Sequence, residues 1–218
     1  GYGNANNEII KECKTKYLLI LNPDTVLNKS CESELLKSIN KKNLDFSIIA
    51  PISQDKNFGF IKKNPELNKR EIFETNYVKG FALLIDVKVI KKIGMFDKNI
   101  FLYFEEIDLC KRLRENNYKI YVNTKAKIFH KAAKSSNMGF QFEKCRHWHW
   151  MWSSVYYKKK HTNYLEVLIN FVPLVFASLL KIIFYTFIFQ KKKIVINYMR
   201  FSGTLNALLG KNSWYRPD

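Results

Sequence analysis

The stretch KGFALLIDVKVIKKIGMFDKNIFLYFEEIDLCKRL, residues 79–113, contains the pattern that decides the fold of this chain. An apolar run at 81–85 predicts a buried strand, and residues 87–92 predict a short helix after it. A second helix begins at Glu105 and Glu106, and its apolar residues recur on or near one face. A strand followed at once by helices is typical of an α/β protein.

The same alternation continues on both sides of this stretch. Upstream, an apolar run at 17–21 predicts a strand, residues from Ser30 predict a helix, and DFSIIAP at 45–51 predicts a further strand that Pro51 ends. Downstream, YKIYV and AKIFH predict two more strands. Strands that alternate with helices predict a mostly parallel α/β sheet.

Composition limits the classes of partner. The chain has 218 residues and 47% hydrophobic residues, enough for one core and an extension. Its net charge of +18 predicts attraction to polyanions, and residues 141–218 carry 12 basic against 3 acidic side chains. Because this charge adjoins the longest apolar run, we expect an anionic membrane surface rather than nucleic acid as the partner.

The apolar run at 167–189 is long enough to span a bilayer. Lys181 lies inside it, Pro173 can kink it, and both of its ends are basic, so helices that lie in one leaflet are favoured while a true span stays open. The tryptophans just upstream, Trp148, Trp150 and Trp152, are typical of an aromatic belt at a membrane interface.

Three groups of polar residues could carry chemistry, and each has a simpler explanation. Asp24 follows a strand, where a carboxylate can hold a divalent cation, but Asn-Pro-Asp is also an ordinary turn. The acidic group at 105–108 could supply a general base, or could simply stabilise the start of a helix. His130 could bind a metal such as manganese, although a histidine at the end of a strand is more often structural.

The order of these motifs is more specific than any one of them. The chain carries four motifs in this order: GYGNANN, LLILNPDT, residues 79–113 and YKIYVNTKAKIFHKAAKSS. In this order it resembles the family two glycosyltransferases, particularly the rhamnosyltransferase-like branch that builds bacterial surface polysaccharides. The resemblance covers roughly residues 1–140. It implies a GT-A fold, a Rossmann-like α/β sheet that binds a nucleotide sugar and a divalent metal.

The resemblance also implies roles for single residues. Asp24 matches the metal-binding aspartate of a D-x-D-type motif, with Asn22 in place of its first acid, and His130, followed by Ser135 and Ser136, matches a histidine that can complete the metal site. Glu105 and Glu106 match the paired acids of the family's E-D motif, whose second member is the catalytic base.

Here that second acid is Glu106, a glutamate rather than the usual aspartate, and Asp108 is the alternative base. Gly80 matches a glycine that leaves room for sugar on the acceptor side. Asn4 and Asn7 match the loop near the nucleotide sugar.

We therefore expect a metal-dependent inverting glycosyltransferase that uses Mg or Mn, a UDP- or dTDP-linked sugar such as rhamnose, and a lipid-linked or glycan acceptor. Residues 1–140 would be a partial, N-terminally truncated GT-A domain lacking its first strands. Residues 141–218 would be a helical region at the cytoplasmic face of the plasma membrane. The alternative is a noncatalytic glycosyltransferase-like protein that binds a membrane or a partner enzyme.

Overall fold

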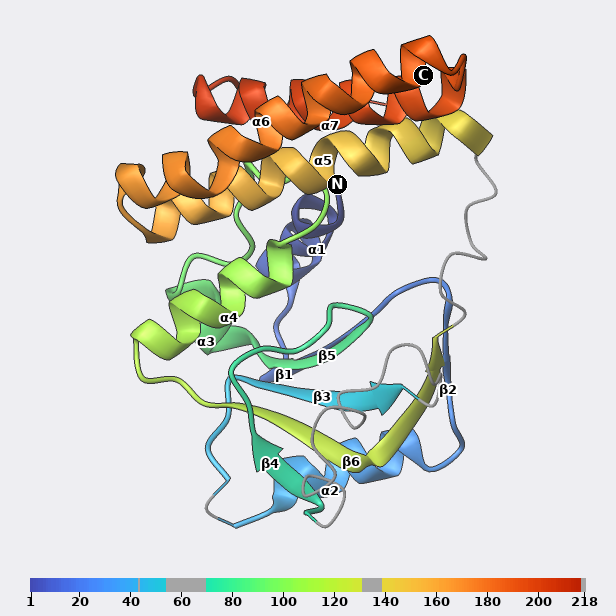
Figure 1. Ribbon diagram of the computed structural model, residues 1–218. Helices are drawn as coiled ribbons and strands as arrows, with labels where there is room; N and C mark the ends of the chain where they lie inside the picture. The colour runs from blue at the N-terminus through green and yellow to red at the C-terminus, as the bar shows by residue number, and fades with distance from the viewer. Residues whose placement is uncertain (43, 54–69, 131–138, 217–218) are drawn as a thin grey trace. The chain divides into compact units, whose positions relative to one another are not determined.

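A computed structural model describes residues 1–42, 44–53, 70–130 and 139–216. Along the chain its elements are α1 (Tyr2–Glu12), β1 (Tyr17–Leu21), β2 (Thr25–Leu27), α2 (Cys31–Asn40), β3 (Ile48–Ser53), β4 (Ile72–Glu74), β5 (Ala82–Asp86), α3 (Val87–Lys92), α4 (Glu105–Glu115), β6 (Ile120–His130), α5 (Gly139–His161), α6 (Tyr164–Phe187) and α7 (Lys191–Leu208). The described strands all precede the three long helices at the C-terminal end of the chain (Figure 1).

The described strands form one mixed sheet. Strands β1, β5, β3, β6 and β2 lie side by side in that order, and β4 also pairs with β6. Among these described strands only β3 and β6 are parallel, whereas the four other pairings are antiparallel. The prediction of a mostly parallel sheet is therefore wrong. Strand β5 lies between β1 and β3 and runs antiparallel to both. The direction of a strand does not change the alternation of strands and helices along the sequence, so the sequence pattern did not reveal it.

Two of the predicted strand boundaries are also wrong. YKIYV and AKIFH belong to one strand, β6, and the side chain of Asn123 bridges the irregular point between them. Its Oδ1 atom accepts hydrogen bonds from the backbone N–H groups of Lys125 (2.8 Å) and Ala126 (3.2 Å). Strand β3 continues past Pro51, and its pairing with β6 shifts register between Pro51 and Ile52.

Helix α2 packs against one face of the sheet, as its buried residues show. It begins at Cys31, close to the predicted start at Ser30. The core on this face consists of Cys31, Leu35, Phe46, Ile49, Phe81, Ala82, Leu84, Ala126 and Ile128. The alternate residues of β5, Leu83 and Ile85, are fully buried from the opposite face. Strand β5 is therefore an apolar strand buried on both faces, which is why its sequence lacks polar alternation.

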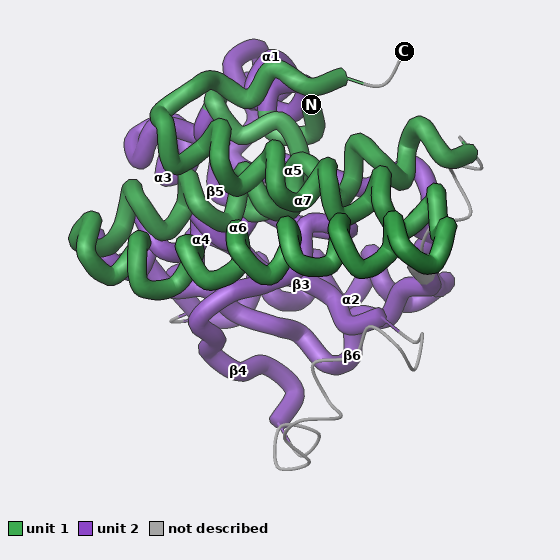
Figure 2. Tube along the Cα trace, turned by 45° about the horizontal axis from the view of Figure 1, so that its top comes forward, with its two compact units in different colours: residues 1–3, 98–105, 136–218 green, residues 4–97, 106–135 purple. Residues whose placement is uncertain are grey.

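The described residues form two compact units that do not follow the order of the chain (Figure 2). Unit 1 contains residues 1–3, 98–105 and 136–218, and unit 2 contains residues 4–97 and 106–135. The sheet belongs to unit 2. The long helices belong to unit 1, together with the loop that leads into Glu105.

Unit 1 has its own aromatic core, in which Trp148 and Trp152 are buried. The prediction that both tryptophans form a membrane belt is therefore wrong, although Trp150 is 52% exposed. The indole N–H of Trp148 donates to Ser202 Oγ of α7 (3.2 Å). Helices α5 and α7 cross closely at Gly203, where a Cβ atom would overlap the carbonyl oxygen of Trp148.

Helix α6 is, among the described helices, the one long and apolar enough to cross a membrane. Its most apolar window has a mean hydropathy of 2.3 and is only 11% buried. Large side chains such as Leu165, Phe176, Leu180 and Phe187 are 61–77% exposed. An apolar helix of a soluble core is mostly buried, so this exposure makes α6 the segment of unit 1 best suited to an apolar environment.

Candidate active site

The loop after β1 is a turn held against the start of β5. The backbone N–H of Asn22 donates to the carbonyl oxygen of Phe81 (2.9 Å), and the hydroxyl of Thr25 donates to the same oxygen (3.1 Å). The N–H of Thr25 also donates to the carbonyl of Asn22 (3.0 Å). Asp24 thus lies in a fixed turn at the carboxyl end of β1, and this turn is anchored by the residue that follows Gly80.

Strand pairing places the backbone of the second predicted metal ligand opposite the residue that follows Asp24. In the β2–β6 ladder, Thr25 pairs with His130, so the backbone of His130 lies across from the residue that follows Asp24. Ser135 and Ser136 lie outside the described residues. Within the described ranges, no group of three or more His, Cys, Asp or Glu side chains could hold a metal ion.

Glu106 and Gly80 are in direct contact. The Glu106 carboxylate accepts hydrogen bonds from the backbone N–H of Gly80 and from its own N–H in the first turn of α4. Phe81, the next residue, anchors the turn that contains Asp24. The dipeptide Gly80-Phe81 therefore links the predicted base to the predicted metal-binding turn, two motifs that are far apart in the sequence.

Burial raises the pKa of Glu106 above the ordinary value of 4.5. Its hydrogen bonds to Glu106 N–H and Gly80 N–H, and the nearby charge of Lys79, oppose that shift without cancelling it. A carboxylate with a raised pKa holds a proton more readily at neutral pH. This is the property required of a general base that takes a proton from a hydroxyl group.

Asp108 has a structural partner. Its side chain is fully buried, and its Oδ2 atom accepts a hydrogen bond from Arg112 Nε at 2.8 Å. The guanidinium of Arg112 also donates to the carbonyl oxygens of Ile93 (2.7 Å) and Met95 (2.5 Å). Asp108 thereby fixes the turn that follows α3. Glu105, the first residue of α4, is 3% exposed.

The predicted loop GYGNANN is helical, because α1 begins at Tyr2. Asn4 is exposed on this helix, whereas Asn7 is buried. The Asn7 amide donates to the carbonyl of Phe96 (2.9 Å) and accepts from the N–H of Phe96 (3.0 Å). Asn7 thus holds the segment between α3 and α4, and a contact of Asn4 or Asn7 with a nucleotide sugar stays a prediction.

Sequence reasoning missed the role of α5 in holding the loop before Glu105. Ser153 Oγ donates to the carbonyl of Leu102 (2.8 Å), and Arg146 Nε donates to the hydroxyl of Tyr103 (2.7 Å). The aromatic rings of Phe101 and His149 lie 4.8 Å apart. The signal that could have revealed this is the spacing of Arg146, His149 and Ser153, which recur at intervals of about one helical turn.

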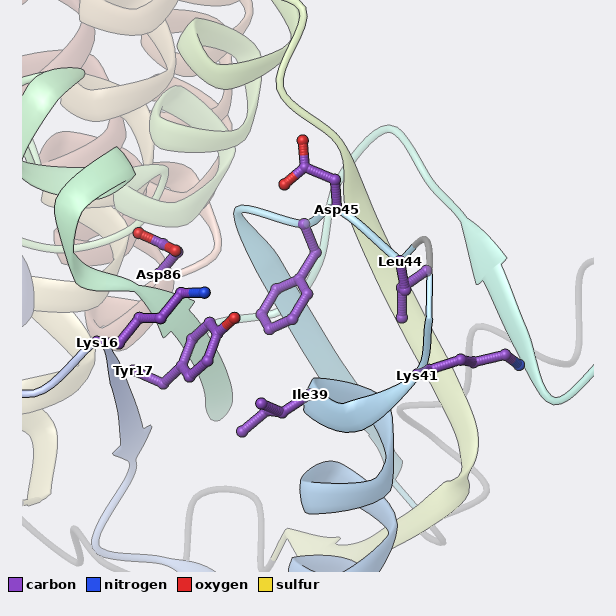
Figure 3. Close-up of a pocket in the computed structure, with 8 residues that line it drawn as sticks. Lys16, Tyr17, Ile39, Lys41, Leu44, Asp45 and Asp86 are labelled. Atoms are coloured by element: carbon purple, nitrogen blue, oxygen red, sulfur yellow. The ribbon is translucent and has the colours of Figure 1, made fainter.

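A pocket of about 350 Å³ lies at the opposite end of β1 (Figure 3). It is lined by Lys16, Tyr17, Ile39, Lys41, Leu44, Asp45, Phe46 and Asp86. Its aromatic wall is the stacked pair Tyr17 and Phe46, with ring centroids 5.2 Å apart. Asp86 caps α3 by accepting from Val89 N–H (3.0 Å). Tyr17 starts β1 whereas Asp24 follows its end, so this pocket is separate from the candidate active site.

Comparisons with known proteins agree with the motifs. No family model matches the chain. The low-salt glycan biosynthesis hexosyltransferase Agl10 of Haloferax volcanii is 29% identical in an alignment over 140 residues that covers 55% of this chain and 45% of Agl10. The rhamnosyltransferase WbbL of Escherichia coli strain K12 is 24% identical in an alignment over 178 residues that covers 68% of this chain and 67% of WbbL. The match thus spans less than half the length of Agl10.

A solved structure shows the same fold. The mannosyltransferase PcManGT from Pyrobaculum calidifontis, in complex with GDP-Man and Mn²⁺, aligns with 97% of this chain and 67% of its own chain, with a TM-score of 0.56 and 9% identity. The chain is thus similar in sequence to two glycosyltransferases and similar in fold to a mannosyltransferase, in agreement with the resemblance read from the motifs.

Proposed function

We propose that this chain forms the catalytic part of a glycosyltransferase that moves a sugar from a nucleoside diphosphate to an acceptor hydroxyl, with inversion at the anomeric carbon. The contact between Glu106 and Gly80 supports this most strongly, because Phe81 joins that pair to the turn containing Asp24. Glu106, the proposed base, and Asp24, the proposed cation ligand, are thus both connected to the dipeptide Gly80-Phe81.

In the proposed reaction, Glu106 takes the proton of the acceptor hydroxyl. The acceptor oxygen then attacks the anomeric carbon while the bond from that carbon to the diphosphate oxygen breaks, and its electron pair leaves with the diphosphate. The Gly80 N–H holds the Glu106 carboxylate in place. We propose that Gly80, which has no side chain, leaves room for a sugar on the acceptor side. We assign Asp108 to the ion pair with Arg112 rather than to proton transfer.

The proposed ligands of a divalent cation are Asn22 and Asp24, which follow β1, and His130, the last residue of β6. Asp24 offers a carboxylate, Asn22 an amide oxygen and His130 an imidazole, a set that suits Mn²⁺ and, through its oxygens, Mg²⁺. When bound, the cation would neutralise negative charge that develops on the departing diphosphate. We propose Asp24 and His130 as the side chains that hold it.

We further propose a lipid-linked or polysaccharide acceptor at the cytoplasmic face of the plasma membrane, and a UDP- or dTDP-linked donor, with rhamnose as one candidate sugar. The exposed apolar side chains of α6 and the basic residues 191–193 that follow it support this location. The name of the relative WbbL supports rhamnose as a donor sugar to test.

A donor screen tests the proposal. The full-length protein would be incubated with UDP-, dTDP- and GDP-linked sugars, with Mg²⁺, Mn²⁺ or EDTA, and released nucleoside diphosphate would be measured. We expect release from one donor, abolished by EDTA and reduced at least about 100-fold in Asp24→Asn.

A matched control is Asp45→Asn, which removes a carboxylate from the pocket at the other end of β1. Asp45→Asn should turn over like the wild type. Binding to anionic vesicles without release from any donor would instead support the alternative, a noncatalytic membrane-binding or partner-binding protein.

A further inference from the structure

Four aromatic side chains of unit 1 form a continuous row, which we call the aromatic row: Tyr103, Phe104, Trp150 and Tyr157. The ring of Trp150 lies 5.2 Å from that of Tyr103 and 5.5 Å from that of Phe104, measured between centroids. Phe104 lies 5.5 Å from Tyr157. The row thus joins the loop before α4 to one side of α5.

The loop half of the row is held in an unusual conformation. Tyr103 and Phe104 have φ angles of +67° and +72°, in the left-handed region that residues with a side chain rarely adopt. Ser153 of α5 donates to the backbone carbonyl of Leu102, just before these residues, and Arg146 of α5 donates to the side-chain hydroxyl of Tyr103. Strained backbone of this kind persists only where the surrounding structure fixes it, and it concentrates at functional sites.

We propose that the aromatic row is a platform for a sugar ring of the acceptor, with Trp150 as its main stacking surface. This inference rests on the proposed function and adds an acceptor subsite to it. Trp150 is 52% exposed, and the apolar C–H face of a pyranose can pack flat against an indole ring. Phe104, which lies between Trp150 and Tyr157 in the row, directly precedes Glu105 and Glu106 in the chain, so the row adjoins the acidic motif in sequence.

Two observations favour a sugar over a membrane as the occupant. The large exposed apolar side chains of unit 1 concentrate on α6. In the aromatic row, only Trp150 belongs to this exposed set. The row also contains a charge-assisted hydrogen bond, from Arg146 to the hydroxyl of Tyr103. Such a bond fixes the edge of a ring, which suits recognition of one ligand orientation better than contact with fluid lipid.

Saturation-transfer NMR with simple glycosides tests the platform without requiring turnover. The probes are the methyl glycosides of rhamnose, mannose and N-acetylglucosamine. We expect a saturation-transfer signal from at least one glycoside with the wild-type protein and a loss of at least about fivefold with Trp150→Ala, since stacking accounts for much of such weak binding. Trp150→Phe, which keeps a smaller ring, should give an intermediate signal.

The matched control is Trp214→Ala. Trp214 is 55% exposed in the same unit, and its ring contacts lie outside the row, with Trp148 and Tyr215. This variant should retain the signal. Equal signals from wild type and Trp150→Ala, or no signal from any glycoside with wild type, would overturn the platform.

Vesicles of phosphatidylglycerol and phosphatidylcholine provide the second arm. Trp150→Ala should bind them like the wild type. A fall in vesicle binding without a fall in glycoside signal would show a lipid contact and overturn the inference. Because the NMR signal needs no donor, a glycoside signal that depends on Trp150 would stand even if the donor screen found no activity, and the two failures are therefore distinguishable.

Discussion

Removal of the Asp108 carboxylate should destabilise the protein without removing its base. Asp108 is fully buried, and Arg112 retains only 17% side-chain exposure, so Asp108→Ala leaves a largely buried cation without its ion partner. Breaking a buried pair in this way costs about 3–5 kcal/mol. Arg112 keeps its hydrogen bonds to the carbonyls of Ile93 and Met95, so we expect the lower end, about 3 kcal/mol.

Asp108→Asn should cost less, about 1–2 kcal/mol, because the amide oxygen still accepts from Arg112 while the charge is lost. For a chain of this size, 1 kcal/mol shifts Tm by about 2–4 °C. The alanine variant should therefore melt about 6–12 °C lower and the asparagine variant a few degrees lower, by differential scanning calorimetry.

The assay pairs these melts with turnover of the donor identified in the screen, measured well below the melting range. Asp108→Asn should turn over within a few-fold of the wild type. Arg112→Met should be destabilised at least as much as Asp108→Ala, because it leaves a fully buried carboxylate without its ion partner. An Asp108→Asn variant with wild-type Tm and a loss of turnover of about 100-fold or more would refute the structural assignment and make Asp108 the base.

Three further outcomes follow from burial and packing. The folded-state pKa of Glu106 is raised, so ionisation of Glu106 favours the unfolded chain as pH rises above 4.5. Glu106→Gln should therefore melt at a higher temperature than the wild type at about pH 8, and this difference in melting temperature should vanish by about pH 4. Burial raises the pKa of the Cys110 thiol to about 12; Cys110 should therefore resist labelling by a thiol reagent in the native protein at about pH 8, and rapid labelling would contradict its burial. Gly203→Ala places a Cβ against the carbonyl oxygen of Trp148 and should lower the free energy of unfolding by about 1–3 kcal/mol. Ala207→Gly, at a buried site one turn further along α7, makes no such overlap and should lower the free energy of unfolding by about 1 kcal/mol. Equal melting temperatures of the wild type and Gly203→Ala would contradict the close crossing of α5 and α7.

Local patterns in the sequence predicted the elements that carry the candidate site. The apolar run at 17–21 and its Asn-Pro-Asp turn, helix α3 at 87–92 and helix α4 from Glu105 all lie where the pattern placed them. Each depends on neighbours within a few residues: hydrophobic periodicity, turn formers and acidic residues at a helix start. Such signals need no knowledge of distant parts of the chain.

Features that depend on distant contacts were missed or wrong. The direction of β5 depends on its pairing with β1 and β3, which no local pattern encodes. The joining of residues 98–105 to the C-terminal helices depends on contacts such as Ser153 with Leu102, which are 51 residues apart. The contact of Glu106 with Gly80 is of the same kind, since only the packing of α4 in unit 2 brings them together.

Donor turnover by Glu106→Gln tests most directly whether Glu106 is the base of the sugar transfer. Turnover and donor affinity would be measured in parallel, the latter by isothermal titration with the donor and metal from the screen. The amide keeps the size of the side chain and an oxygen for the Gly80 N–H, so the variant should bind donor with a Kd within about threefold of the wild type. Its turnover should fall by about 100-fold or more, because the amide cannot take a proton. Turnover within about threefold of the wild type, with donor binding intact, would contradict the account.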